Sequence, residues 1–407
     1  MGAPVAAPAA PSVPVANAEA PSAAPAVMAP GVLAPAGTRV ALLAPLSGTN
    51  AERGQALVRA AQMALEAPGS PALDVIDTQG TPAGAAAGVQ TAISNGAGLI
   101  LGPLTNAETA AVAGPAAAAG VAVLAFTSDP TQARPGVWVL GLTPAQQVRR
   151  LVFAAQAQGR SRFAALLPQG DFGGAMATAL GQATAEAGLG TPDIRTVDRG
   201  MQAANVAVRD LSGYASRRGP IEAERRAALA RHDAEGRKQA AELSKKGIPG
   251  PPFDALLLAD TGDQLSAITT LLPYYDVDSP AVRVLGPALW ADPGARGGAD
   301  LSGAWYAAPD PAMRSGFSQQ FQAKFGGPPP GLADLAFDAA SIARVVAQGG
   351  GFAQASLARP EGFAGVDGVL ALQADGTVRR GLAVFEVQRG GARVIEPAPE
   401  AMGAPGI

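Results

Sequence analysis

From Thr38 onward the chain alternates short, wholly apolar runs with longer stretches rich in alanine. Runs that are apolar along their whole length are typical of strands covered on both faces, and the stretches between them have the length of helices. Strands are predicted at 39–43, 73–77, 98–101, 121–126 and 137–140, and helices at 51–67, 83–94 and 107–119. This alternation predicts parallel βαβ units, and therefore a doubly wound α/β lobe.

The same pattern restarts after Thr143. Helices are predicted at 145–158, 174–187, 263–272 and 332–347, and strands at 163–167, 194–197, 255–258 and 282–285. Near the C-terminus, the apolar stretches 369–372 and 382–387 flank an Asp375-Gly376 pair and predict a β-hairpin. The chain is therefore expected to be an α/β protein with two doubly wound parallel-sheet lobes in series.

Two segments depart from this pattern. Residues 1–37 are nearly all Ala, Pro, Val and Ser, and the repeated prolines predict an extended tether or a disordered tail. Residues 209–250 interrupt the second lobe, and positions 209–246 hold ten basic and six acidic residues, a net charge of +4. Because apolar residues are sparse there, we expect an exposed helical insert whose charges form either a solvated face or a docking surface.

The charge balance, the lack of Cys and the missing motifs exclude several classes of function. The 407 residues are enough for two or three domains. With 30 Lys and Arg against 33 Asp and Glu, the chain lacks the excess of cations that nucleic-acid binding needs, so we expect no nucleic-acid partner. It has no Cys, which excludes thiol nucleophiles, disulfides and Cys-rich zinc sites, and its single His, His232, lies in the charged insert. Phosphate-loop, nucleophile-elbow and metalloprotease motifs are missing from the sequence. We therefore expect a binding protein rather than an enzyme, with no catalytic residue, cofactor or metal.

Polar residues gather directly after the predicted strands. In parallel sheets ligands bind outside the carboxyl ends of strands, so these residues are the candidate ligand contacts. Those identified by position alone are Ser47, Ser128, Asp171 and Asp260. Each precedes or opens a helix, so N-capping of that helix is the alternative role.

Four segments carry a family resemblance: Val40 to Gly48 (VALLAPLSG), Asp77 to Gly84 (DTQGTPAG), Leu99 to Thr105 (LILGPLT) and Gly120 to Pro130 (GVAVLAFTSDP). They resemble the first lobe of the type I periplasmic-binding-protein superfamily, the Leu/Ile/Val-binding type. Within it, the run ILGPLTNAETAAVAGPAAAAGVAVLAFTSD is most similar to the bacterial penicillin-binding-protein activators. The resemblance covers about residues 38–396.

The resemblance implies two lobes that close by a hinge on a ligand cleft between them. Chain crossings between the lobes are expected near Leu142, Leu301 and Pro360. Lobe 1 would then comprise 38–142 and 302–359, lobe 2 would comprise 143–301 and 360–396 with the insert 209–250, and 397–407 would be a flexible tail.

It also implies further site residues. In the amino-acid binders, residues after the third and fourth strands hold the ligand's carboxylate and ammonium groups, and these positions fall on Thr105, Asn106, Thr127 and Asp129. An aromatic and an acidic residue of the second lobe close over the ligand, and they fall on Phe172 and Asp263. Phe172 replaces the usual Tyr, and Asp129 would repel a ligand carboxylate. Both differences favour a partner-binding or cell-wall role.

The predicted function is therefore that of an extracytoplasmic penicillin-binding-protein activator in peptidoglycan synthesis. The alternative is the substrate-binding receptor of an ABC transporter for branched-chain amino acids or similar small polar solutes. The expected partner is accordingly a penicillin-binding protein, or a small polar ligand such as an amino acid or a cell-wall fragment. No secretory signal is visible, so the chain is either cytosolic or preceded by further sequence. The resemblance implies the periplasm, with an outer-membrane lipoprotein anchor upstream as the only route to a membrane.

Overall fold

The computed structural model describes residues 37–404 and 406–407. The predicted tether, residues 1–37, lies outside the described residues except for Gly37. Within the described part of the chain, no helix is long and apolar enough to cross a membrane.

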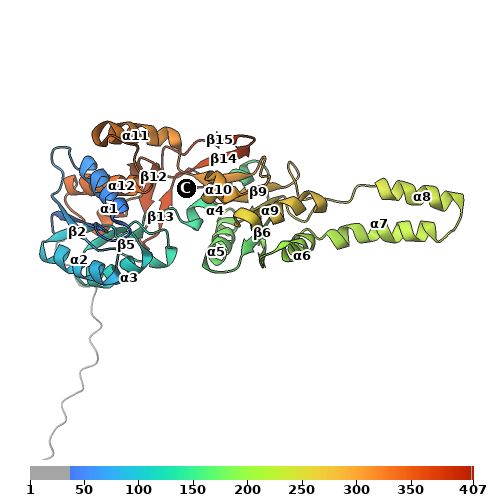
Figure 1. The fold of residues 1–407 in the computed structure, drawn as a ribbon, viewed down its shortest axis with the longest axis horizontal. Helices are drawn as coiled ribbons and strands as arrows, with labels where there is room; N and C mark the ends of the chain where they lie inside the picture. The colour runs from blue at the N-terminus through green and yellow to red at the C-terminus, as the bar shows by residue number, and fades with distance from the viewer. Residues whose placement is uncertain (1–36, 405) are drawn as a thin grey trace, which may run out of the picture. The chain divides into compact units, whose positions relative to one another are not determined.

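The first lobe is built on a five-stranded sheet whose paired strands are all parallel (Figure 1). Its strands are β1 (Arg39–Ala44), β2 (Leu73–Asp77), β3 (Ala97–Leu101), β4 (Ala122–Ala125) and β5 (Val137–Val139), in the order β2-β1-β3-β4-β5. The connecting helices are α1 (Ala51–Ala64), α2 (Pro82–Ser94) and α3 (Asn106–Ala118). The predicted elements of this lobe are confirmed within a few residues. The strand order reverses between β1 and β3, which marks the switch point where ligands bind in such sheets.

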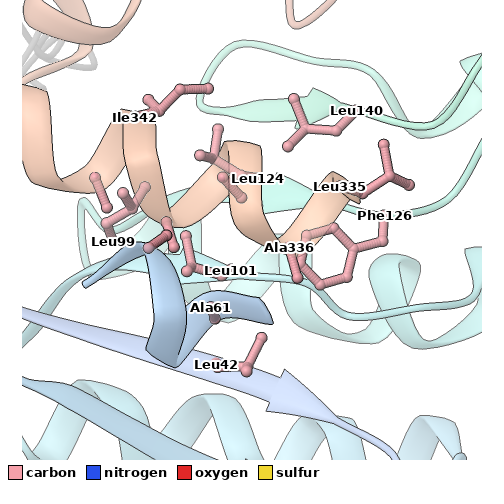
Figure 2. Packing of buried hydrophobic residues seen from close by; sticks show 14 of the residues in the cluster. Leu42, Ala61, Leu99, Leu101, Leu124, Phe126, Leu140, Leu335, Ala336 and Ile342 are labelled. Carbon is pink, nitrogen blue, oxygen red and sulfur yellow. The ribbon is translucent and has the colours of Figure 1, made fainter. Parts of the chain in front are cut away.

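Both faces of this sheet are buried, as the wholly apolar strands predict. Alternate residues of β3 point to opposite faces, so Leu99 and Leu101 pack in one cluster and Ile100 packs in another. Figure 2 shows the first cluster, in which α12 (Ala333–Gln348) and α1 cover the sheet. Burying one such leucine side chain contributes roughly 1.5–3 kcal/mol. The other face is covered by α2 and α3.

The second lobe repeats this topology and adds to it. Its seven strands are β6 (Phe163–Pro168), β7 (Asp193–Val197), β8 (Ala255–Leu258), β9 (Arg283–Gly286), β10 (Trp305–Ala308), β14 (Ala383–Gln388) and β15 (Gly391–Glu396). The parallel part, β7-β6-β8-β9-β10, has the same order as the first sheet, with β14 and β15 added antiparallel at one edge. Its main helices are α4 (Pro144–Ala157), α5 (Asp171–Glu186), α6 (Met201–Leu211) and α9 (Gly262–Leu271). The predicted fold class, two doubly wound α/β lobes, is confirmed.

Several short elements and one further long helix, α11, complete the two lobes. They are the 3₁₀ turns η1 (Pro130–Gln132), η2 (Pro273–Tyr275) and η3 (Ala288–Ala291), the helices α10 (Pro293–Arg296), α11 (Pro311–Phe325) and α13 (Gln354–Leu357), and the strands β11 (Phe363–Gly365), β12 (Gly368–Leu372) and β13 (Val378–Arg380). Strands β11, β12 and β13 form a small antiparallel sheet. The predicted hairpin is therefore wrong in its second arm: β12 pairs with β13, whereas 383–388 pairs with β10 in the second lobe.

The chain passes between the two lobes at places that differ in part from those expected. The first crossing follows Leu140, close to the expected Leu142. The second follows Ala308 rather than Leu301, because β10 completes the parallel order of the second sheet. The third lies between Val378 and Leu382 rather than near Pro360, because the small sheet packs into the first core.

The expected flexible tail makes contacts with the body of the protein. Ala398 is buried in the second core, and its N–H donates to Asp310 at 3.1 Å. The carbonyl oxygen of Ile407 accepts a hydrogen bond of 3.1 Å from Arg379. Residues 398 and 407 are therefore tied to the folded lobes.

The charged insert is helical, as predicted, and forms a hairpin of two helices. These are α7 (Tyr214–Leu229) and α8 (Ala234–Lys245), which pack against each other (Figure 1). Only Ile221 and Ala228 of α7, and Gly236 and Ala240 of α8, are buried. We call residues 214–246 the arm.

Candidate functional site

The predicted ligand residues of the first lobe follow strands β1, β3 and β4. Ser47, after β1, is exposed, and its hydroxyl donates to Asp77 at the end of β2 at 2.8 Å. The Leu46 N–H donates to the same carboxylate at 2.8 Å. Burial acts to raise the pKa of Asp77, but these hydrogen bonds and one from the Gln79 N–H outweigh it and lower the pKa. Asp77 is therefore a carboxylate held ionised at the rim of the lobe.

Thr105, after β3, is used to begin α3. Its hydroxyl and the side chain of Glu108 form a reciprocal capping box at the helix N-terminus. Glu108 is fully buried and also accepts a hydrogen bond of 2.5 Å from the Thr78 hydroxyl. The capping role, which the sequence left as the alternative for residues at strand ends, is the one that the structure shows for Thr105.

Asn106, Thr127 and Asp129 are brought together after β3 and β4. The Asn106 side-chain amide donates to Asp129 at 3.4 Å, and the Asp129 N–H donates to the Thr127 hydroxyl at 3.1 Å. Asp129 also accepts from the N–H and hydroxyl of Thr131, at 3.0 and 2.7 Å, and so caps η1. Burial acts to raise the pKa of Asp129, but these hydrogen bonds outweigh it and lower the pKa. Ser128 between them is exposed.

The polar rim of the first lobe is therefore largely self-satisfied. The side chains of Ser47 and Asn106 donate hydrogen bonds to carboxylates of the same lobe, and the Thr105 hydroxyl donates one to Glu108. Two carboxylates, Asp77 and Asp129, remain at the rim with lowered pKa values. This arrangement presents negative charge where an amino-acid binder would need to attract a ligand carboxylate.

In the second lobe, the predicted residues after β6 lie on the first turn of α5. Gly170 precedes the helix with a φ of 101°, a conformation that favours glycine and turns the chain sharply out of β6. Asp171 and Phe172 follow it, and both are exposed, Phe172 to 37%. An exposed aromatic ring at this position is free to contact a ligand or a partner.

Asp260, after β8, is the predicted residue with the most perturbed chemistry. It is only 8% exposed, and its Oδ2 atom has no hydrogen-bond partner among the described residues. Burial raises its pKa to about 6, against the opposing charge of Arg199. Its backbone carbonyl accepts from the indole of the buried Trp290 at 3.1 Å, which fixes the strand end. Asp263, three residues on, is exposed in the first turn of α9.

Two cavities lie elsewhere. One, of about 610 Å³, runs between β7 and α6 and is lined by Arg195, Arg199, Gln202 and Val206 among others. The second, of about 270 Å³, is lined by α4, α5 and the turn between β12 and β13. Neither is lined by any of the predicted ligand residues. That Asn106, Thr127 and Asp263 face one another across a cleft stays a prediction.

The first and third crossings between the lobes are hydrogen-bonded together. Arg380, at the third crossing, donates to the Leu140 carbonyl at the first, at 3.1 Å. From α4, the Gln146 amide donates to the Val378 carbonyl at 2.7 Å, and Arg150 donates to the Leu382 carbonyl at 2.8 Å. These bonds link the start of the second lobe to the strand that leaves the first. We call this region the hinge.

A cluster of buried charges lies beside the hinge. Three carboxylates, Asp334, Asp338 and Asp367, are each at most 7% exposed. Arg314 pairs with Asp334 at 3.1 Å, and Arg380 lies 3.7 Å from Asp338. Burial raises the pKa of Asp338 to about 6, and burial together with the neighbouring Asp334 raises the pKa of Asp367 to about 8.

The sequence did not single out the residues of this cluster, nor Asp77, Glu108 and Arg199. Asp77 had a visible signal, because it is a polar residue at the carboxyl end of a predicted strand. Glu108 also had one, because it stands three residues after Thr105 in the spacing of a capping box. Asp338 and Asp367 had none, because their partners come from distant parts of the chain.

The comparisons with known proteins agree with this architecture. Residues 37–215 match the family model described as periplasmic binding protein. The comparison with curated proteins finds no match.

Solved structures extend the similarity to most of the chain. A protein from Rhodospirillum rubrum assigned to a branched-chain amino acid ABC transporter aligns with a TM-score of 0.67 at 17% identity, over 88% of this chain and 100% of that protein. The C-domain of LpoA from Haemophilus influenzae, a regulator of PBP1A, aligns with a TM-score of 0.61 at 17% identity, over 88% of this chain and 99% of the domain. The leucine-binding protein LivK from Thermotoga maritima aligns with a TM-score of 0.53 at 16% identity, over 91% and 100%.

Identities this low show the fold alone. The proteins compared are an ABC-transporter protein, a regulator of PBP1A and a leucine-binding protein. The described chain thus has a two-lobed α/β fold shared with these proteins, and residues 37–215 match the family model of the periplasmic binding proteins.

Proposed function

We propose that the chain is an activator of a penicillin-binding protein and acts in peptidoglycan synthesis. The observation that carries this proposal is the self-satisfied rim of the first lobe. In a receptor, the strand-end donors must be open to a solute; here the Asn106 amide donates to Asp129 and the Ser47 hydroxyl donates to Asp77. A ligand would have to displace these bonds, each of which is charge-assisted.

The charge of the rim also favours an activator over an amino-acid receptor. A free amino acid brings a carboxylate, and Asp77 and Asp129 are both held ionised by lowered pKa values. Two like charges near one ligand carboxylate are unfavourable, whereas the same acidic rim can pair with basic side chains of a protein. The fold shared with the LpoA C-domain, a regulator of PBP1A, supports a partner-binding role.

A second candidate is the receptor of an ABC transporter. The buried Oδ2 atom of Asp260 favours it, because an acceptor with no donor among the described residues suits an ammonium or hydroxyl group of a ligand. The exposed ring of Phe172 would then cover that ligand from the second lobe. This candidate predicts a polar solute with a positive group and no strong need for its carboxylate.

The two candidates are separated by one paired experiment. The purified chain is tested for binding to the purified periplasmic region of a penicillin-binding protein by biolayer interferometry, and for thermal stabilisation by an amino-acid and peptidoglycan-fragment panel. The proposal predicts saturable binding to the protein and no shift with free amino acids. A shift of several degrees with one amino acid, lost in Thr127→Val, together with no protein binding, would establish the receptor instead.

The proposal also assigns a location. We expect the native protein in the periplasm, either free or as an outer-membrane lipoprotein. Cell fractionation with periplasmic and cytoplasmic marker enzymes tests this. Recovery of the native protein with the cytoplasmic marker would contradict it.

A further inference from the structure

The arm is fixed firmly at its root. The Arg217 side chain donates to the carbonyl oxygens of Pro249 and Tyr275, both at 2.7 Å, and to that of Ser212 at 2.8 Å. Tyr214 packs edge-on against Tyr275, with ring centroids 5.1 Å apart. Three backbone segments are thus held by one guanidinium group, so the start of α7 is rigidly attached to the second lobe.

Beyond its root, the arm adds little to the core of the lobe. Of its hydrophobic residues, only Tyr214 packs against either hydrophobic cluster of the second lobe. The two helices touch along small residues, and Gly236 approaches so closely that a Cβ atom there would overlap the Ala228 carbonyl oxygen. A segment of 33 residues that buries so little is not explained by the stability of the lobe.

The arm differs in charge from the rest of the chain. Its nine basic and five acidic residues give it a net charge of +4, and because the whole chain carries −3, the remainder carries −7. Four of the nine cations are in ion pairs with described residues. The other five, which make no such pair among the described residues, are Arg226, Arg237, Lys238, Lys245 and Lys246, all exposed.

Two of the unpaired cations of α8, Lys238 and Lys245, face away from α7. At about 100° per residue, Lys238 and Lys245 lie within about 20° of each other around α8, roughly 140–180° from the buried Gly236 and Ala240. This side of α8 is therefore the outer face of the hairpin, with no side chain of α7 to neutralise it. Long, exposed cations on the second helix of an arm whose root is held in place form a surface suited to an acidic partner.

We propose that the outer face of α8 is a docking surface for an acidic patch on the penicillin-binding protein. This inference rests on the proposed function and names the part of the chain that makes the contact. Glu235 and Glu242 stand among the lysines, and such a mixed pattern fits a protein surface better than a uniformly anionic lipid surface. The arm also lacks the apolar stripe of a membrane-bound helix, since Leu229 is its only large apolar side chain that is clearly exposed.

Charge reversal on the full chain tests the inference. The variants are Lys238→Glu with Lys245→Glu, and, to avoid repulsion from the nearby glutamates, Lys238→Gln with Lys245→Gln. The matched control is Arg53→Glu with Arg389→Glu, two exposed arginines of the lobes without ion pairs to described residues. Circular dichroism and thermal unfolding verify that each variant is folded.

Binding to the immobilised periplasmic region of the penicillin-binding protein is measured at low and physiological salt. We expect the glutamate variant to weaken binding at least tenfold, the glutamine variant to weaken it less, and both to flatten the salt dependence, while the control changes it less than twofold. Equal binding by all variants would overturn the docking surface and leave the proposed function standing. Failure of the wild-type chain to bind would refute the proposed function and, with it, this contact. If the glutamate variant lost binding to phosphatidylglycerol vesicles but bound the penicillin-binding protein as the wild type does, the docking surface would be overturned in favour of a membrane contact.

Discussion

Replacing Asp367 by Asn tests the electrostatics of the hinge. The cluster there holds three buried carboxylates, Asp334, Asp338 and Asp367, against two guanidinium groups, Arg314 and Arg380. With every group ionised it carries one excess negative charge in a low-dielectric surrounding. Burial and the neighbouring carboxylate of Asp334 therefore raise the pKa of Asp367 to about 8, so that it holds a proton at neutral pH.

The size of the effect follows from linkage. The ordinary pKa of the carboxyl is 3.8, and each unit of difference between the folded and unfolded states corresponds to about 1.4 kcal/mol. Between pH 4 and pH 8 the folded state keeps a proton that the unfolded state releases, so the free energy of unfolding falls as the pH rises. The full shift, from 3.8 to about 8, sets an upper limit of roughly 6 kcal/mol for this loss, and we expect on the order of 2–5 kcal/mol.

The assay is urea unfolding at pH 5 and pH 8, followed by the fluorescence of the three fully buried tryptophans. Asp367→Asn removes the titrating group, so the variant should be more stable than the wild type at pH 8 and close to it at pH 5. Glu400→Gln, at an exposed position without an ion pair to described residues, is the control and should leave the pH dependence unchanged. A variant that is less stable than the wild type at pH 8 would refute the reasoning.

Three further outcomes are expected. Glu108→Ala should lower the free energy of unfolding in urea by about 2–4 kcal/mol, because a buried hydroxyl and the N-terminus of α3 lose their acceptor; a loss below about 0.5 kcal/mol would contradict this. Gly236→Ala should speed hydrogen exchange across the arm because the helices must separate, whereas Gly181→Ala in α5, where an added Cβ meets no atom within 4 Å, should stabilise the protein by about 0.5–1 kcal/mol; equal effects would argue against close helix packing. Any cationic ligand that pairs with Asp260 should bind more weakly as the pH falls through about 6, since protonation removes the charge; calorimetric titration from pH 5 to 7.5 would expose a flat affinity.

The fold was predicted correctly over the apolar strands of both sheets, but two elements in the C-terminal third of the chain were missed. Strands such as β1 and β3 are apolar along their length, so both their type and their bounds could be read from the sequence. Neither β10 (Trp305–Ala308) nor α11 was predicted; α11 buries only Phe317 and Phe321, so its apolar face is sparse. Because these two elements were not predicted, the second crossing between the lobes was expected near Leu301 rather than after Ala308.

For the candidate site, the sequence predicts which polar residues follow each strand but not how residues from different strands interact. The polar residues after each strand could be named, and so could capping as their alternative role. Which of them bond to one another depends on side-chain geometry, as in the pairing of Asn106 with Asp129. The hinge contacts could not be predicted from the sequence, because Arg380 and Leu140, which are hydrogen-bonded there, are 240 positions apart.

The most direct test of the proposed function is the rate of glycan-strand synthesis by a purified penicillin-binding protein, with and without the full chain. We predict that saturating chain raises the rate severalfold, and that the Lys238→Glu, Lys245→Glu variant needs a much higher concentration for the same increase. A rate that stays unchanged while the wild-type chain is in excess would contradict the claim that this protein is a penicillin-binding-protein activator.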